Sequence, residues 1–141
     1  MKILLLNGPN LGRLGSRKPE VYGHTTLAEL LDRAVEHARL RGAELSAFQS
    51  NYEGALIDRL EKLDFDAVVI NPGALGHTSY ALRDAIEGID RPTVEVHISD
   101  VHRREEFRTV LVLEDVVIGQ VIGHGVDGYL EGIDLLLARE P

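Results

Sequence analysis

Residues 67–73 read Ala-Val-Val-Ile-Asn-Pro-Gly, and this stretch decides the fold class. Its first four residues are apolar without interruption, whereas a strand with one face in water alternates apolar and polar side chains. The continuous run therefore predicts a strand that is buried on both faces, as in a parallel sheet covered by helices on each side. The run stops at Asn71-Pro-Gly, a sequence typical of a turn.

The chain around this run alternates between β-rich and helix-periodic segments. Because crossovers between parallel strands are right-handed, this alternation predicts an α/β fold: a flavodoxin-like three-layer sandwich with a five-stranded parallel sheet, order 2-1-3-4-5. No linker or internal repeat divides residues 1–141, so we expect a single domain. The expected strands lie near residues 2–7, 44–49, 66–71, 93–98 and 115–122, and the expected helices near residues 26–41, 53–63, 78–88, 102–107 and 127–138.

Three local signals place helix ends. Thr26 is followed three residues later by Glu29, and Ser50 by Glu53, which is the capping-box pattern at a helix start. Gly42 stands where the first long helix should stop.

The composition excludes several kinds of site and partner. There is no cysteine, which rules out a disulfide framework, a thiolate metal site and a cysteine nucleophile. A formal net charge of −8 argues against a nucleic-acid partner, because phosphate contacts need an extensive basic surface. No run approaches the roughly 18 apolar residues of a membrane span, and the first residues do not resemble a signal peptide. We therefore expect a cytoplasmic protein that binds neither nucleic acid nor membrane.

Polar side chains follow three of the expected strands. Asn7 ends the first strand, Asn71 and His77 follow the third, and His97 and Ser99 follow the fourth. Ligands of such sheets bind beyond the carboxyl ends of the strands, so these side chains predict a binding site at one edge. The alternative reading is that each residue only caps a strand or forms a turn.

A basic segment follows His97. Arg103, Arg104 and Arg108 lie within eleven residues of this imidazole in an acidic chain, a pattern that favours a small anionic ligand. Free backbone N–H groups after Ser99 and Asp100 could bind a carboxylate, although this pair could equally be a simple helix cap.

The loop at residues 10–24 supplies a second candidate group, Tyr22. A phenol has a pKa near 10 and becomes a base near neutral pH only if nearby cations lower that pKa, as Arg13 and Arg17 could do. The alternative is that the ring only packs on the domain. A phenolate at Tyr22 and an imidazolium at His97 would together suffice to take a proton from one carbon and expel hydroxide from the next.

Other chemistries have weaker support. His97 and His102 do not have the spacing of metal ligands on one helix face, so we expect no metal and no cofactor. The three lysines, Lys2, Lys18 and Lys62, occupy positions typical of solvated amines rather than of a Schiff-base nucleophile. A receiver-like module is a poor match, because it would need an acidic pair after the first strand, which here ends in Asn7. A flavin-binding module would need aromatic side chains around the flavin, and the chain has no tryptophan. Tyr52, Tyr80 and Tyr129 are expected at helix starts, in structural roles.

At these residues the sequence resembles the type II 3-dehydroquinases. The resemblance covers nearly the whole chain and implies a flavodoxin-like subunit, a homo-oligomer built as a dodecamer from trimers, and no cofactor. It also implies anti elimination of water from the small-molecule substrate 3-dehydroquinate through an enolate, a step of the shikimate pathway. The motifs that carry it are Asn7-Gly-Pro-Asn-Leu-Gly-Arg-Leu-Gly, Pro19-Glu-Val-Tyr-Gly, Gln49-Ser-Asn, Asn71-Pro-Gly-Ala, His77-Thr-Ser, Leu82-Arg-Asp84, Glu95-Val-His-Ile-Ser, Arg104-Glu-Glu-Phe-Arg108, Gly123, Gly125 and Gly128-Tyr129.

The resemblance also implies catalytic roles by position. Tyr22 matches the family's base, and Arg17 matches the arginine that lowers its pKa and closes with the lid loop. Asn10 matches the residue that holds a water against the enolate. His97 matches the acid that protonates the departing C1 hydroxyl, and Glu95 orients it.

The substrate would be held by a second group of residues. By position, Asn71, Ile98 and Ser99 lie at the carboxylate, and His77 and Arg108 lie at the ring hydroxyls. Asn71 also assists the acid.

Two further residues match family positions. Asp84 would enter from a neighbouring subunit, and Arg104 would support the site.

Three departures from the family pattern stand out. Gly76 replaces a usual Thr, Asp100 replaces a usual Asn, and residues 109–114 replace a more polar segment. These changes concern loop rigidity, local charge and the way Arg108 is held, while every named catalytic group is present. A catalytically silent scaffold of the same fold stays open as the alternative.

Overall fold

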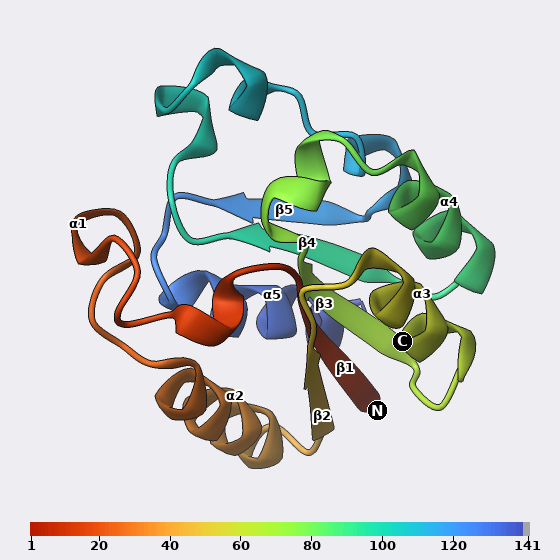
Figure 1. Cartoon of the computed structure of the whole chain (residues 1–141). Helices are drawn as coiled ribbons and strands as arrows, with labels where there is room; N and C mark the ends of the chain where they lie inside the picture. Colours follow the sequence, from red (N-terminus) through yellow and green to blue (C-terminus); the bar gives the residue numbers. More distant parts are fainter. Residues whose placement is uncertain (140–141) are drawn as a thin grey trace.

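The computed structural model describes residues 1–139 and contains one five-stranded parallel sheet (Figure 1). Its strands are ordered β2-β1-β3-β4-β5, so the predicted flavodoxin-like order is confirmed. The strands are β1 (Lys2–Asn7), β2 (Glu44–Gln49), β3 (Ala67–Asn71), β4 (Thr93–His97) and β5 (Gly119–Ile122). The α-helices are α1 (Pro19–Tyr22), α2 (Leu27–Leu40), α3 (Glu53–Glu61), α4 (Tyr80–Ile89) and α5 (Asp127–Ala138).

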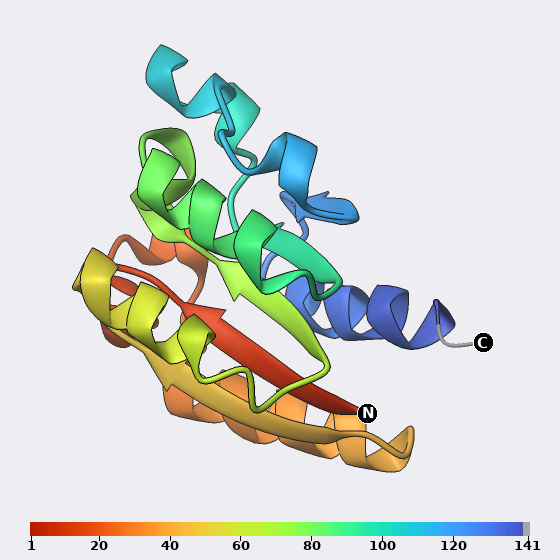
Figure 2. The ribbon, with the colours of Figure 1, turned by 90° about the vertical axis from the view of Figure 1, so that its right-hand side faces the viewer.

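The sheet separates two apolar layers. On one face, Ile3 and Leu5 of β1 share a core with residues of α2 and α5. On the other face, Leu4 and Leu6 share a core with residues of α3 and α4. Figure 2 shows the helices on both sides of the sheet. Every residue of β3 is buried, as expected from the continuous apolar run at residues 67–70.

The helix-end signals are partly confirmed. The amide of Glu29 donates to the hydroxyl of Thr26, the residue that caps α2, and the Gly42 that follows this helix has φ +78°. The capping box predicted at Ser50 is wrong, because α3 begins at Glu53 and its N-cap residue is Tyr52. The Ser50 hydroxyl instead accepts from the Tyr52 amide, and the Glu53 carboxylate accepts from a hydroxyl of another segment, that of Ser79.

Two expected elements differ in the structure. The expected helix at residues 102–107 is two short 3₁₀ turns, Val101–Arg103 and Glu106–Thr109, because the chain returns to an extended conformation at Arg104. The expected strand at residues 115–122 begins only at Gly119, since Val116 ends a 3₁₀ turn and Val116 and Val117 pack, partly buried, against the core instead of pairing with β4. The one-turn helix α1 has no helical periodicity in the sequence and was not expected.

The strand register brings the polar strand ends together. Asn7 of β1 pairs with Asn71 of β3, so these two amides leave the sheet side by side. His97 ends the adjacent strand β4, where it pairs with Ile122 of β5. One edge of the sheet therefore gathers the side chains singled out in the sequence. Within residues 1–139, no helix combines the length and the apolar character needed to cross a membrane.

Candidate active site

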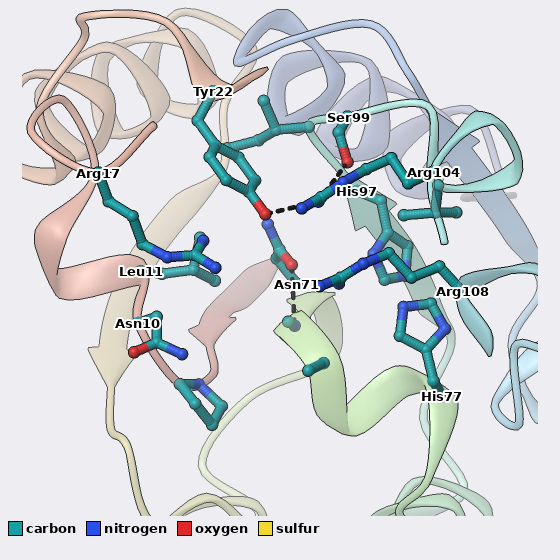
Figure 3. A pocket seen from close by; sticks show the side chains of 15 residues that line it. Asn10, Leu11, Arg17, Tyr22, Asn71, His77, His97, Ser99, Arg104 and Arg108 are labelled. Carbon is teal, nitrogen blue, oxygen red and sulfur yellow. Dashed lines mark hydrogen bonds between the residues drawn. The ribbon is translucent and has the colours of Figure 1, made fainter. Parts of the chain in front are cut away.

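A pocket opens beyond the carboxyl ends of the strands (Figure 3). Its walls come from the loop after β1, the turn after β3 and the segment after β4. The side chains predicted from the sequence that line it are Asn10, Arg17, Tyr22, Asn71, His77, His97, Ile98, Ser99, Arg104 and Arg108.

The loop after β1 carries three of these side chains. Asn10 adopts a left-handed conformation with φ 71°, and its backbone N–H donates to Oδ1 of Asn51 at 2.9 Å. The loop then runs to α1, which ends at Tyr22. The Arg17 guanidinium lies 4.9 Å from the centre of the Tyr22 ring. Arg13, the second arginine considered in the sequence, is exposed and does not line the pocket.

The phenol of Tyr22 accepts a hydrogen bond directly from Arg104. Nη1 of Arg104 donates to the phenol oxygen at 2.7 Å and to Oγ of Ser99 at 3.2 Å. Burial raises the pKa of Tyr22, but hydrogen bonds from Arg104 and then Arg17, together with their charges, outweigh it, so that the pKa is lowered. Arg104, given only a supporting role from the sequence, is thus the larger source of this effect.

His97 forms a hydrogen bond with the buried carboxylate of Glu95 on the side of the ring away from the pocket. Its Nε2 lies 2.7 Å from Oε2 of Glu95, which is fully buried. The other oxygen of Glu95 accepts from Nε2 of Gln120 at 2.8 Å. A carboxylate on Nε2 favours a proton on that nitrogen and leaves Nδ1 as the ring nitrogen able to reach the pocket. Glu95 itself does not line the pocket, in keeping with an orienting role.

His77 stacks on His97 with a ring-centre distance of 5.8 Å. Nδ1 of His77 donates to the carbonyl of Val110 at 2.8 Å, which leaves Nε2 for the pocket. Burial lowers the pKa of His77 and outweighs the hydrogen bond to Val110, which raises it, and the nearby charges of His97 and Arg108 add to the lowering. In the neutral ring Nε2 carries no proton, so it can accept a hydrogen bond in the pocket without adding charge.

The segment at residues 109–114 supports His77 through its backbone. Besides the carbonyl of Val110, the amide of Val112 donates to the carbonyl of Gly76 at 2.8 Å. The apolar side chains of this segment include Leu111 and Leu113, which are buried. Arg108 is held separately, by a 2.8 Å bond from its Nε to Glu105. The apolar replacement of this segment therefore adds core packing.

The departure at Gly76 has a direct geometric meaning. A Cβ at this position would lie 2.8 Å from the ring of Pro72, 3.2 Å from Glu95 Oε2 and 3.2 Å from His97 Cε1. A side chain at this position would thus require the Pro72 ring to shift and would crowd the Glu95–His97 pair.

Asp84 is the one predicted site residue that is remote from the pocket. It lies on α4 and borders a separate surface cavity with Ile57 and Leu63. A single chain therefore does not bring Asp84 to the other candidates.

Sequence reasoning did not identify two polar residues behind the pocket. Gln120 is a polar residue among the apolar ones of β5, and this was the available signal. Tyr129 is fully buried, and its hydroxyl contacts Asn7 and Asn71. Nothing in the local sequence of α5 indicates that contact.

Among residues 1–139, no three histidine or acidic side chains converge in a way that could hold a metal ion. The donors in the pocket are instead guanidinium, imidazole, amide and hydroxyl groups. Such a set suits a polar, anionic organic molecule and can exchange protons with it.

Comparisons with known proteins point to one family. The model of the family "Dehydroquinase class II" matches residues 1–137. The chain is 53% identical over 139 residues to a 3-dehydroquinate dehydratase of Anoxybacillus flavithermus, covering 97% of this chain and 94% of the relative. It is 49% identical to the "Catabolic 3-dehydroquinase 1" of Fusarium vanettenii over 134 residues, or 94% of this chain and 93% of that one.

A solved structure agrees with these relatives. The fold is similar to the crystal structure of the type II dehydroquinase from Butyrivibrio crossotus, with a TM-score of 0.94 and 44% identity. The match covers 96% of this chain and 97% of that one.

Proposed function

Because the chain belongs to the class II dehydroquinase family, we propose that it is a 3-dehydroquinate dehydratase, a hydro-lyase of the shikimate pathway. The observation that carries this proposal is the phenol of Tyr22, bonded to Arg104 at 2.7 Å in a pocket that His97 also lines. An elimination of water needs one group to remove a proton and another to protonate the leaving hydroxyl. These two side chains meet that need without a cofactor.

Tyr22 is the base. Its pKa is lowered by Arg104 and Arg17 against the opposing effect of burial, so the phenolate is populated at a lower pH than in water. The phenolate removes the proton from C2 of 3-dehydroquinate and leaves an enolate. A water held by Asn10, which lines the same pocket, stabilises the enolate oxygen.

His97 is the acid. Glu95 accepts from its Nε2 and orients the ring, so that Nδ1 is the nitrogen that donates a proton to the C1 hydroxyl as it leaves. Asn71 lines the pocket and assists by hydrogen bonding. Base and acid act on opposite faces of the ring, which gives anti elimination.

The remaining polar groups hold the substrate. Asn71, Ile98 and Ser99 bind its carboxylate, and His77 and Arg108 bind its ring hydroxyls. All five line the pocket, which supports this assignment.

The activity is tested by incubating the purified chain with 3-dehydroquinate and following absorbance. Loss of water conjugates the new double bond with the ketone, so the enone absorbance should rise with time. A flat trace from folded protein would favour the alternative, a catalytically silent scaffold.

Removing Arg104 should raise the pKa of Tyr22 and move the rising limb of the pH–rate profile to higher pH. The sign follows from the contacts, because a lost cation disfavours the phenolate and a higher pH is then needed to form it. Arg104→Met should shift the profile more than Arg17→Met, since Arg104 contacts the phenol directly. Ultraviolet titration of the phenol, with Tyr22→Phe subtracted, measures the same pKa.

Arg103→Met is the matched control for that experiment. It removes the same charge from the neighbouring residue, whose side chain is 87% exposed and pairs with Asp100. We expect the phenol titration to be unchanged in this variant. Equal shifts in Arg103→Met and Arg104→Met would contradict a local effect of Arg104.

The active form is a homo-oligomer, a dodecamer built from trimers, in which Asp84 completes the site of a neighbouring subunit. The position of Asp84 outside its own chain's pocket supports this proposal. Light scattering at assay concentration should give a mass well above that of a dimer. A fully active monomer would contradict the shared site.

A further inference from the structure

A buried hydroxyl lies directly behind the pocket. Tyr129 is fully buried in the first turn of α5, and its ring belongs to the core between that helix and the sheet. The helix approaches the sheet closely because the preceding residue is Gly128, where a Cβ would lie 3.3 Å from Val96 and 3.4 Å from Val121. The close approach lets the phenol reach the ends of β1 and β3.

The hydroxyl of Tyr129 joins two asparagines in a single chain of hydrogen bonds. It donates to Oδ1 of Asn7 at 2.7 Å and accepts from Nδ2 of Asn71 at 2.8 Å. Oδ1 of Asn71 in turn accepts from the backbone amide of Gly73 at 3.0 Å. Burial raises the pKa of the Tyr129 phenol well above its usual value, so the group stays a neutral donor.

The donors and acceptors in this series of hydrogen bonds can be assigned in only one way. The Gly73 amide can only donate, so the Asn71 oxygen must face it and the Asn71 nitrogen must face Tyr129. The Tyr129 oxygen then accepts, and its own proton goes to Asn7. The opposite order would leave Gly73 without its acceptor. Nδ2 of Asn7 is buried without a hydrogen-bond partner among the described residues. Leaving this donor unpaired costs folding free energy, and the arrangement is kept despite that cost.

We infer that Tyr129 is a positioning residue for the proposed dehydratase reaction, because it fixes the amide of Asn71 in the orientation that serves the substrate. With Oδ1 turned to Gly73 and one proton of Nδ2 bonded to Tyr129, the second proton of Nδ2 is the donor left for the pocket. The inference rests on the proposed function and extends it by one residue that does not touch the substrate.

The test is Tyr129→Phe, which deletes one oxygen and keeps the ring in the core. We expect kcat/KM to fall by about tenfold to a hundredfold, because small errors in a positioned group have effects of that size. Tyr52→Phe is the matched control, since that residue is 76% exposed and should tolerate the change without loss. An unchanged kcat/KM in folded Tyr129→Phe would overturn the inference.

A double-mutant cycle separates positioning from a general loss of structure. If Tyr129 acts through Asn71, then Tyr129→Phe should change kcat/KM by less than about twofold in an Asn71→Ala background. The same fold loss in both backgrounds would show a merely structural role and would refute the inference. Should Asn71→Ala turn over too slowly, the cycle is measured from the Kd of the product, 3-dehydroshikimate.

A second variant covers the case in which Tyr129→Phe does not fold. Asn7→Ala removes the acceptor that directs the Tyr129 proton, so Tyr129 no longer enforces the orientation of the Asn71 amide and only the Gly73 amide holds it. The same dependence on Asn71 is expected, and its absence would again overturn the inference. The parent chain distinguishes the two failures: an inactive parent defeats the proposed function, whereas an active parent with additive losses defeats only the role of Tyr129.

Discussion

Replacing Tyr22 with phenylalanine should lower kcat about a thousandfold or more, the range expected when a general base is lost. The substitution deletes only the phenol oxygen, which accepts a 2.7 Å hydrogen bond from Arg104. The ring, which is half-buried and packs against the core, remains. Fold and substrate affinity should therefore stay close to those of the parent, and the loss should appear in kcat.

The measurement is steady-state kinetics together with binding of 3-dehydroquinate to the inactive variant. Tyr80→Phe provides the control, because Tyr80 is 71% exposed and lies outside the pocket. A rate for Tyr22→Phe within tenfold of the parent would exclude Tyr22 as the base.

Replacing His97 with asparagine should lower kcat by about a hundredfold to a thousandfold, because the leaving hydroxyl loses its proton donor. The side chain is buried at the end of β4 and is bonded to Glu95, so it has one orientation toward the pocket. Asparagine keeps a hydrogen-bonding group of similar polarity but cannot carry the proton. The rate is measured at saturating substrate, where weaker binding no longer contributes.

His102→Asn is the matched control for His97→Asn. That histidine is exposed, lies five residues further along the same segment and does not line the pocket. Near-parental kcat is expected for it. Comparable losses in both variants would mean that the segment, and not the imidazole of His97, determines the rate.

Most of the fold could be predicted from the sequence because its strands are buried on both faces. A run such as residues 67–70 can satisfy that burial only between two helical layers, and right-handed crossovers then restrict the strand order. The errors fall where side-chain pattern and tertiary packing disagree. Val116 and Val117 have strong β-propensity but pack against the core instead of pairing, so β5 begins later than its composition suggested.

The site could be predicted in outline, because residues at strand ends converge whatever their rotamers. The side chains that these residues contact could not be predicted. Which arginine contacts Tyr22 depends on the path of two loops, and the structure gives the direct bond to Arg104 with Arg17 over the ring. The contact of Tyr129 with Asn71 spans 58 residues of sequence and depends on how closely α5 approaches the sheet.

The central claim is that the Tyr22–His97 pair performs an anti elimination without a covalent amine adduct. All three lysines, Lys2, Lys18 and Lys62, are exposed, whereas a nucleophilic lysine is desolvated in an apolar pocket or lies beside another cationic group.

Stereospecifically C2-deuterated 3-dehydroquinate, turned over in the presence of borohydride, tests that claim most directly. The account predicts that the label lost is the one expected for anti elimination, that activity is retained, and that the mass of the protein does not change. Syn loss of the label, or a reduced substrate adduct on any lysine, would contradict it.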